Sequence, residues 1–360
     1  MKDFLDHSFL SQLSRRDFLK LSGSSLLAGL WLPALGQFST RGILKPDPEI
    51  AVPSFGRITT SDNAFIYDAP SFSGNPIRTY WKDLVLPITA VTLSENTDDY
   101  NRVWYQLNNE GYMYSGIVQP VEILSNQPDF NIPPDGRLAE ITVPFTDAYK
   151  NPLHPENGTQ RLYYSTMYWV LNIYQDEEGT YWYLIQDDYF KEDYYYVNTE
   201  HVRFLGPEEV APLSPDTAPE AKRLEVLLAT QTVIAYENEE PVFMARVATG
   251  ARWRLGVYLT PVGRHIIQHK RPQRHMTSNS PASALGYDLP GVPWVSYFTE
   301  SGVSFHGTFW HNDYGRPRSH GCVNMTPQAS KWVYRWTLPV VAYNEAMNWE
   351  ETGTIVDVIE

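Results

Sequence analysis

Residues 57 to 205 consist of short runs in which apolar and polar residues alternate, separated by Asn, Asp and Gly. Alternation of this kind predicts β-strands joined by tight turns. The runs of the first half recur in the same order in the second half. They lie at 64–67, 104–107 and 111–114, and then at 141–143, 181–185 and 195–197. The sequence therefore predicts an internal repeat of two modules, residues 57–122 and 137–205.

Each predicted module is small and rich in aromatic residues, and it resembles the SH3-like barrels that bacterial wall enzymes carry as accessory modules. Two interpretations of aromatic residues such as Trp104 and Trp182 stay open. We favour the first, in which they fill the cores of the barrels. In the second, they form a surface that contacts glycan or other parts of a cell wall, or one that gates access of the substrate.

A different organisation follows the modules. Residues 206–221 hold four prolines among acidic residues and predict a semi-rigid linker. Alternating runs at 224–228, 233–236 and 242–247 predict a β-meander. A helix is expected from Pro327 to Leu338, capped by Thr326 and ended by Pro339. These signals predict a third domain over residues 222–343, followed by a C-terminal tail, 344–360.

The first residues predict export. Arg15 and Arg16 precede an apolar run from Leu21 to Leu35, and residues 1–36 resemble a twin-arginine signal peptide. A Pro-containing lead-in, residues 37–56, would follow. We expect the protein in the cell wall, the periplasm or the medium. A signal that stays uncleaved would instead tether the protein to the membrane, although its apolar run is short for a full span.

Composition narrows the class of protein further. The 24 Tyr, 11 Trp and 15 Phe residues favour strands, so we expect a mainly β protein with one or two helices. A formal net charge of −14 argues against nucleic acid as a partner, because phosphate backbones attract positive surfaces. The sequence contains one cysteine, which cannot form an internal disulfide and is a candidate reactive thiol.

That cysteine lies in a segment with a chemical pattern. Cys322 is part of Ser-His-Gly-Cys-Val-Asn, residues 319–324, and His306 precedes it by sixteen residues (322 − 306 = 16). A histidine that takes the proton of a thiol produces the thiolate that attacks acyl carbons. Gly321 permits a sharp turn that directs the N–H groups of Gly321 and Cys322 at an oxyanion. The plain alternative is that Cys322 is a small buried apolar residue.

The segment resembles the catalytic signature of the L,D-transpeptidases of the YkuD type. Residues 319–324 match the second element of that signature, His306-Gly307 matches the first, and 248–250 and 260–263 match weaker upstream elements. The likeness covers residues 223–343 and implies a β-sandwich-like fold with a capping subdomain. It implies Cys322 as nucleophile, His306 as base and the Gly307 carbonyl as the group that orients the base. Further residues would shape the pocket, the oxyanion site and the substrate contacts: Ser319, His320, Gly321 and Asn324.

The resemblance also implies a reaction. Cys322 would attack the carbonyl of the third residue of a peptidoglycan tetrapeptide stem, release the terminal D-alanine and pass the acyl group to an amine. No cofactor is expected. Water as acceptor would make the protein an L,D-carboxypeptidase, and a non-catalytic wall-binding protein is a further alternative. A metal site is disfavoured, because His265 and His269 lie in a predicted strand and not on a helix.

Arg316 and Arg318 precede the cysteine by six and four residues (322 − 316 = 6, 322 − 318 = 4). In one interpretation, which we slightly favour, they belong to a solvated loop. In the other, one of them holds the terminal carboxylate of the stem peptide through two parallel hydrogen bonds.

Overall fold

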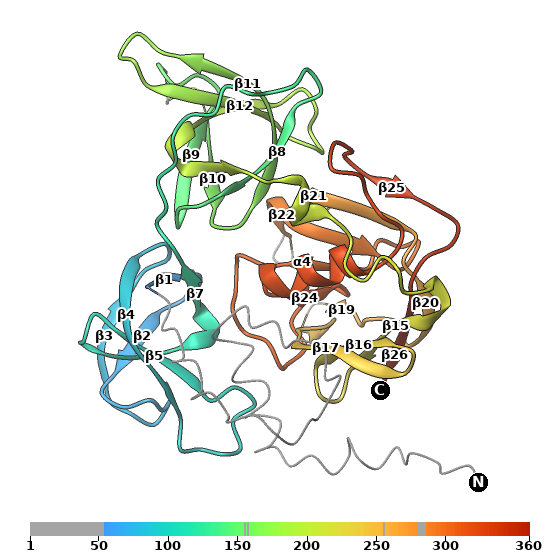
Figure 1. Ribbon diagram of the computed structural model, residues 1–360. Coiled ribbons are helices and arrows are strands. Elements are labelled where there is room, and N and C mark those ends of the chain that lie inside the picture. The colour runs from blue at the N-terminus through green and yellow to red at the C-terminus, as the bar shows by residue number, and fades with distance from the viewer. Residues whose placement is uncertain (1–53, 155, 157, 255, 279–285) are drawn as a thin grey trace, which may run out of the picture. The chain divides into compact units, whose positions relative to one another are not determined.

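The computed structural model describes residues 54–360 except 155, 157, 255 and 279–285. The predicted signal peptide and all but the last residues of the predicted lead-in lie outside the described residues. Strands dominate the described part, where the α-helices are α3 (Pro207–Val210) and α4 (Pro327–Trp336) (Figure 1). The mainly β fold class is confirmed.

The first module is a seven-stranded antiparallel sheet with the strand order β3-β2-β6-β5-β4-β1-β7. The last two residues of the predicted lead-in, 55 and 56, belong to strand β1 instead. This strand pairs with β4 and β7. The strands are β1 (Phe55–Ile58), β2 (Ala64–Tyr67), β3 (Pro76–Tyr80), β4 (Val85–Leu93), β5 (Val103–Leu107), β6 (Gly111–Tyr114) and β7 (Val118–Val121).

The second module repeats this topology. Its sheet has the order β10-β9-β13-β12-β11-β8-β14, which is the order of the first sheet with seven added to each strand number. In both modules a 3-10 turn, Ser115–Ile117 or Thr199–His201, precedes the last strand. The strands are β8 (Arg137–Ile141), β9 (Phe145–Tyr149), β10 (Thr159–Tyr163), β11 (Met167–Gln175), β12 (Tyr181–Gln186), β13 (Tyr194–Asn198) and β14 (Val202–Phe204).

Aromatic side chains fill the centres of both modules. Trp104 and Tyr105 of β5 are almost fully buried, and Tyr183 of β12 is buried in the second module. Trp182 is only half-buried, and its indole N–H donates to Asp176. Burial of large rings supplies much of the apolar area on which such small modules depend.

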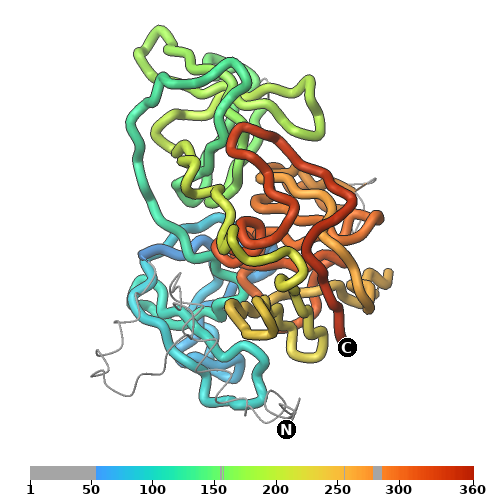
Figure 2. Tube along the Cα trace, turned by 45° about the vertical axis from the view of Figure 1, so that its right-hand side comes forward, coloured from blue at the N-terminus to red at the C-terminus, as the bar shows by residue number. Residues whose placement is uncertain are grey.

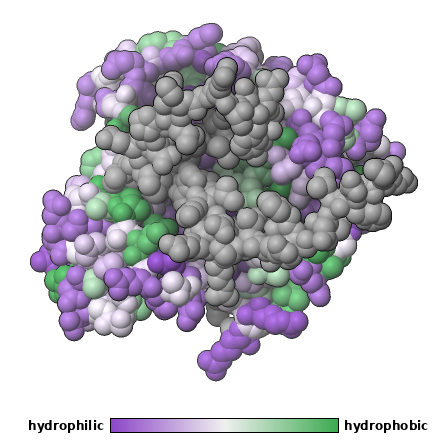
Figure 3. Space-filling view, turned by 60° about the horizontal axis from the view of Figure 1, so that its bottom comes forward, coloured by the Kyte–Doolittle hydropathy of each residue, from purple (hydrophilic) through white to green (hydrophobic). Residues whose placement is uncertain are grey.

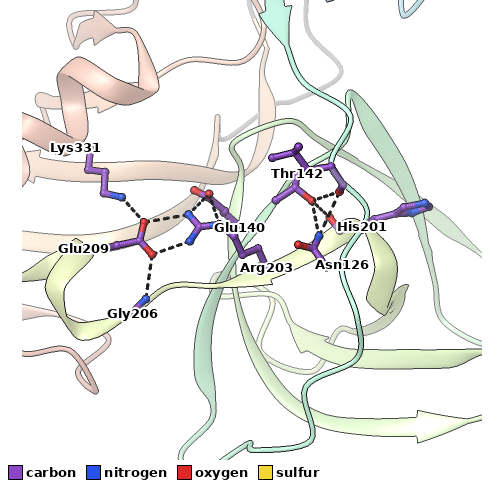
Figure 4. A network of polar contacts seen from close by, with 9 residues as sticks. Asn126, Glu140, Thr142, His201, Arg203, Gly206, Glu209 and Lys331 are labelled. Carbon is purple, nitrogen blue, oxygen red and sulfur yellow. Dashed lines mark hydrogen bonds and ion pairs between the residues drawn. The ribbon is translucent and has the colours of Figure 1, made fainter. Parts of the chain in front are cut away.

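The segment after the second module is anchored to its neighbours by charge. Glu209 of α3 accepts hydrogen bonds from Arg203 of β14 and from Lys331 of α4, the latter at 2.9 Å (Figure 4). Arg203 also pairs with Glu140 of β8. The Pro-rich segment therefore takes part in an ion-pair network that joins four elements, β8, β14, α3 and α4.

The third domain contains two five-stranded sheets and a hairpin, β18 (Arg252–Trp253) with β19 (Gly256–Val257). One sheet has the order β17-β16-β15-β26-β20 and the other β24-β23-β22-β21-β25. The first comprises β15 (Lys222–Leu227), β16 (Thr232–Glu237), β17 (Glu240–Arg246), β20 (Gly263–Ile266) and β26 (Ile355–Ile359). The second comprises β21 (His269–Thr277), β22 (Asp288–Tyr297), β23 (Ser304–Gly307), β24 (Val323–Met325) and β25 (Asn348–Trp349).

One buried cluster draws apolar residues from both sheets and from α4. Val226 of β15, Phe305 of β23 and Val323 of β24 belong to it together with Val333 and Trp336 of the helix. The helix begins as expected, with the Thr326 side chain accepting from the Ala329 N–H, and it ends at Trp336, two residues before the predicted end. Its apolar stripe packs on the sheet that carries β23 and β24.

The structure corrects the predicted boundary at the C-terminus. Residues 344–360 are not a tail, because β26 lies between β15 and β20 and pairs with both, parallel to β15 and antiparallel to β20. Figure 2 shows the red C-terminal segment returning to the yellow strands. A run of five residues gives little local signal, and the position of the strand is decided by partners about 90 or more residues away in the sequence.

The surface carries apolar residues among polar ones. On the face drawn in Figure 3, hydrophilic residues predominate and apolar residues gather in patches between them. Trp253, Tyr258 and Leu259 are among the exposed large apolar side chains of the third domain. Within the described residues no helix has the length and apolar character needed to span a membrane.

Candidate active site

The candidate nucleophile and base lie on one face of two neighbouring strands. Strands β23 and β24 pair in parallel, with Phe305 opposite Val323 and His306 opposite Asn324. Because side chains alternate along a strand, His306 shares its face with Ser304, and Cys322, directly before β24, shares that face with Asn324. Diagonal neighbours on a sheet face are about 7–8 Å apart, within reach of an imidazole.

Cys322 is half-buried, and its side chain contacts Ser304. Its Sγ lies 3.7 Å from Ser304 Oγ and donates to the Gly302 carbonyl at 3.8 Å. Burial raises the pKa of the thiol, and the hydrogen bonds from Ser304 lower it in part. The resting group is therefore a neutral thiol at neutral pH, and it needs a base before it can attack.

His306 is 2% exposed and is oriented as a base. Its Nδ1 lies 3.1 Å from the Gly307 carbonyl oxygen, which can only accept, so Nδ1 carries the proton and Nε2 is left with a free lone pair. Burial lowers the pKa of the imidazole to about 4, although the bond to Gly307 opposes this shift. The ring is neutral at pH 7 and able to accept a proton.

The turn before the thiol is closed by Ser319. The Ser319 hydroxyl accepts from the Gly321 N–H at 3.1 Å and donates to the Cys322 carbonyl. Gly321 has φ +112°, a conformation that favours glycine. The Gly321 N–H is thus already engaged, which differs from the expectation that it points at an oxyanion.

The weaker upstream elements of the sequence pattern hold this turn. Thr260 Oγ1 donates to the Gly321 carbonyl at 2.7 Å and accepts from the Gly250 N–H at 2.9 Å. The Ala251 N–H donates to the Ser319 carbonyl at 3.0 Å. A Cβ on Gly250 would lie 2.1 Å from the Tyr258 carbonyl oxygen, so the close approach of these segments requires glycine.

Aromatic rings surround His320, and the sequence analysis did not identify them. The ring centroids of Trp253, Tyr258 and Tyr287 lie 5.9, 4.6 and 5.4 Å from that of His320. His320 Nε2 is buried and has no hydrogen-bond partner among the described residues, and burial lowers the pKa of the ring. These rings come from 253–258 and 287, far from the motif, and no periodicity links them to it.

The remaining predicted residues are bound to other groups. Both Arg316 and Arg318 pair with one oxygen of Asp313, at 2.7 and 2.5 Å. The Asn324 amide lies 2.9 Å from His311 Nε2. The structure therefore gathers Cys322, His306, Gly307 and the 319–322 turn, whereas the two arginines lie on Asp313.

A groove lies beside the loop that carries the Gly302 carbonyl, the acceptor of the Cys322 thiol. It has a volume of ≈ 600 Å³, and its walls include Pro261, His265, Phe298 and the loop 299–301, which leads directly to Gly302. In the described part of the chain, no group of three or more His, Cys, Asp or Glu side chains is arranged to hold a metal ion.

A half-buried thiol, a neutral imidazole on the same sheet face and a turn held by hydrogen bonds from neighbouring segments are groups that covalent acyl transfer can use. The family model of the L,D-transpeptidase catalytic domain, YkuD, matches residues 221–358. These residues are therefore assigned to that domain family. No curated protein matches the chain significantly.

Solved L,D-transpeptidases are similar to this chain over part of its length. The Mycobacterium smegmatis enzyme is 21% identical, with a TM-score of 0.32, over 39% of this chain and 59% of its own. The Mycobacterium tuberculosis L,D-transpeptidase 1 is 22% identical, with a TM-score of 0.29, over 39% and 62%. The Stackebrandtia nassauensis enzyme is 25% identical, with a TM-score of 0.29, over 42% and 63%. This chain spans less than two thirds of these relatives, and the assignment rests on the family model.

Proposed function

We propose that the protein is an exported cysteine L,D-transpeptidase that acts on peptidoglycan stem peptides. The observation that carries the proposal is the placement of His306 and Cys322 on one face of β23 and β24 within the domain that the family model matches. The twin-arginine pattern of residues 15–16 supports an extracytoplasmic site of action, where such a substrate lies.

Acylation begins with proton transfer. His306 Nε2 takes the proton of Cys322 as Sγ bonds to the carbonyl carbon of the third stem residue. The tetrahedral intermediate collapses, the bond to the terminal D-alanine breaks, and the imidazolium returns its proton to the leaving amine. The third residue is then held as a thioester on Cys322.

Deacylation repeats these steps with a second nucleophile. An amine from another stem attacks the thioester carbon, loses its proton to His306 and forms the cross-link, and Cys322 leaves as a thiolate that recovers a proton. Ser304 is placed to hydrogen-bond the thiolate at both stages, because its hydroxyl already lies beside Sγ.

The acceptor distinguishes the proposal from its nearest alternative. Incubating the purified protein with a disaccharide-tetrapeptide and separating the soluble products should yield a cross-linked dimer and free D-alanine. A tripeptide product without dimer would instead identify an L,D-carboxypeptidase with water as acceptor. Absence of both products would favour a non-catalytic wall-binding protein.

The accessory modules fit an enzyme whose substrate is a polymer. We infer that they are SH3-like, as their repeated topology suggests, and that they bring the catalytic domain to the wall. Binding of the isolated wall polymer to a Cys322→Ala variant, compared with binding by residues 222–360 alone, would test that role.

A further inference from the structure

The segment between the two catalytic residues is buried without being regular structure. Residues 309–318 join the strand of His306 to the turn of Cys322, and they contain no helix or strand. Nevertheless, Asn312 is 8% and Asp313 0% exposed. Buried polar groups of an irregular segment require hydrogen-bond partners from elsewhere in the protein.

The first module supplies these partners. The Asn312 N–H donates to the Gly116 carbonyl at 3.0 Å, and its side-chain amide donates to the Ser115 carbonyl at 3.2 Å. The hydroxyls of Tyr100 and Tyr114 donate to Asp313 Oδ1 at 2.6 and 2.7 Å. Side-chain and backbone contacts thus hold the same short stretch.

Asp313 is the centre of this contact. While Oδ1 receives the two tyrosine hydroxyls, Oδ2 receives Arg316 and Arg318. Burial opposes ionisation, but the hydrogen bonds and the two cations hold the pKa of Asp313 below its ordinary value. A buried carboxylate that lost its donors would be left uncompensated, which is strongly unfavourable.

From Asp313 the contact continues to the catalytic motif. The Asp313 N–H donates to His311 Nδ1 at 3.1 Å, so the neutral His311 carries its proton on Nε2. The Asn324 amide nitrogen is placed 2.9 Å from that Nε2. Two N–H donors cannot bond to each other, so we assign the amide the flipped orientation, in which its oxygen accepts the His311 proton. Asn324 lies opposite His306 in the β23–β24 register.

The two modules differ at the residues that make this contact. Gly116, in the 3-10 turn of the first module, corresponds to the exposed Glu200 in the second. A Cβ at position 116 would lie 2.8 Å from Asp313 Oδ1. Tyr114 precedes the turn in the first module, whereas Asn198 precedes it in the second and caps its own turn by accepting from the Glu200 N–H.

We propose that the first module helps to maintain the geometry of the active site. Tyr100 and Tyr114 of this module and Asp313 of the catalytic domain are positioning residues. They hold the 309–318 segment and, through His311 and Asn324, the geometry of His306 and Cys322. On this account Arg316 and Arg318 serve the same segment by binding Asp313. The measurement of turnover in the test below rests on the proposed function, whereas the measurement of Cys322 alkylation does not.

The test compares wild type with the double variant Tyr100→Phe/Tyr114→Phe, which removes two hydroxyls and keeps both rings. Tyr183→Phe is the matched control, because it removes a buried hydroxyl that bonds only to Asp129 among the described residues. Two quantities are measured: the rate of Cys322 alkylation by iodoacetamide against pH, and kcat and KM with a disaccharide-tetrapeptide.

We expect the double variant to lose kcat by on the order of tenfold with little change in KM, since placement of the reacting groups and not substrate binding is disturbed. Its alkylation profile should move toward that of an exposed thiol, with an apparent pKa of about 8.5. Tyr183→Phe should match wild type in both measurements.

A folded double variant that matches wild type in kcat and in the alkylation profile would overturn the proposal. If wild type shows no turnover, the proposed function fails and the alkylation profiles alone decide this inference. If circular dichroism shows the double variant to be unfolded, Tyr100→Phe, at the more exposed hydroxyl, carries the test with the same criteria.

Discussion

The thiol of Cys322 and the imidazole of His306 are each shifted toward the neutral form by burial. Burial raises the pKa of the thiol and lowers that of the imidazole to about 4. The two shifts oppose a resting thiolate–imidazolium pair and favour proton transfer during attack. Ser304 is the neighbour that stabilises the thiolate once it forms, because it already lowers the thiol pKa.

Alkylation of Cys322 should therefore depend on pH in a defined direction. Because burial raises the thiol pKa, the thiolate should form only at a pH above the ordinary pKa of a free thiol. Iodoacetamide should therefore react slowly at pH 7 and faster as the pH rises through 9. The profile should lack a plateau between pH 5 and 8. A plateau there would indicate a resting ion pair and contradict the assignment of neutral partners. Ser304→Ala should shift the profile to still higher pH.

His306→Ala should reduce turnover by about 10²- to 10⁴-fold, the usual contribution of a general base. Because the rest of the site stays in place, KM should change little. The measurement is steady-state release of D-alanine, with a thermal melt to establish that the variant is folded. Turnover close to wild type would mean that another group takes the thiol proton.

At the scale of elements, the catalytic turn depends on segments that approach it from behind. Thr260 ties Gly250 to Gly321 through one hydroxyl, which accepts from the first and donates to the second. The segments meet where Gly250 has no side chain. This support depends on a close backbone contact at Gly250, and substitution at that one position tests it.

Gly250→Ala should destabilise the domain by about 1–3 kcal/mol or more, the usual range for overpacking, because the new methyl would meet the Tyr258 carbonyl at 2.1 Å. Urea unfolding measures the change in the free energy of unfolding. Gly302→Ala is a control, since no atom lies within 4 Å of a Cβ there and only its φ of +92° is unfavourable. A smaller loss in Gly250→Ala than in Gly302→Ala would contradict the close approach.

Local patterns were sufficient to predict several elements. The Thr326 cap and Pro327 marked the start of α4, and the alternation at 224–247 predicted the three strands β15, β16 and β17. Strand β26 was not predicted, because its partners are distant in sequence and its own five residues are too short a run to distinguish a strand from an irregular tail. The capping and alternation signals are local, whereas the placement of β26 is decided by the sheet.

For the site, too, the sequence predicted the residues of the contiguous motif but not those that folding brings to it. Residues 306 and 319–324 carry a contiguous pattern, so Cys322 and His306 could be singled out before the fold was known. The rings around His320 and the hydroxyl of Ser304 are brought to the site by folding, and no sequence pattern near the motif indicates them. The Asp313 contacts with Tyr100 and Tyr114 link residues about 200 positions apart and could not be derived from spacing.

At the scale of the whole molecule, two modules of one topology make different polar contacts with the catalytic domain, although Tyr163 of the second module also stacks on Phe309. The first module donates hydrogen bonds to Asp313 and accepts them from Asn312, whereas the second is joined through Arg203, Glu209 and Lys331 to helix α4.

The proposed export concerns the whole chain and rests on residues outside the described part. Replacing Arg15-Arg16 with Lys-Lys should leave the precursor inside the cell, because twin-arginine export depends on that pair. Immunoblots of cell fractions measure the distribution, with the unchanged signal as control. Normal secretion of the Lys-Lys protein would remove the twin-arginine proposal and leave the enzymatic one intact.

The central claim is that Cys322 forms a thioester with a peptidoglycan stem. Intact-protein mass spectrometry after mixing with a disaccharide-tetrapeptide tests it most directly. We predict an adduct with the mass of the substrate minus D-alanine, located on the peptide that contains Cys322 and absent from Cys322→Ala. Turnover by Cys322→Ala, or wild-type turnover with the adduct on another residue, would contradict the account.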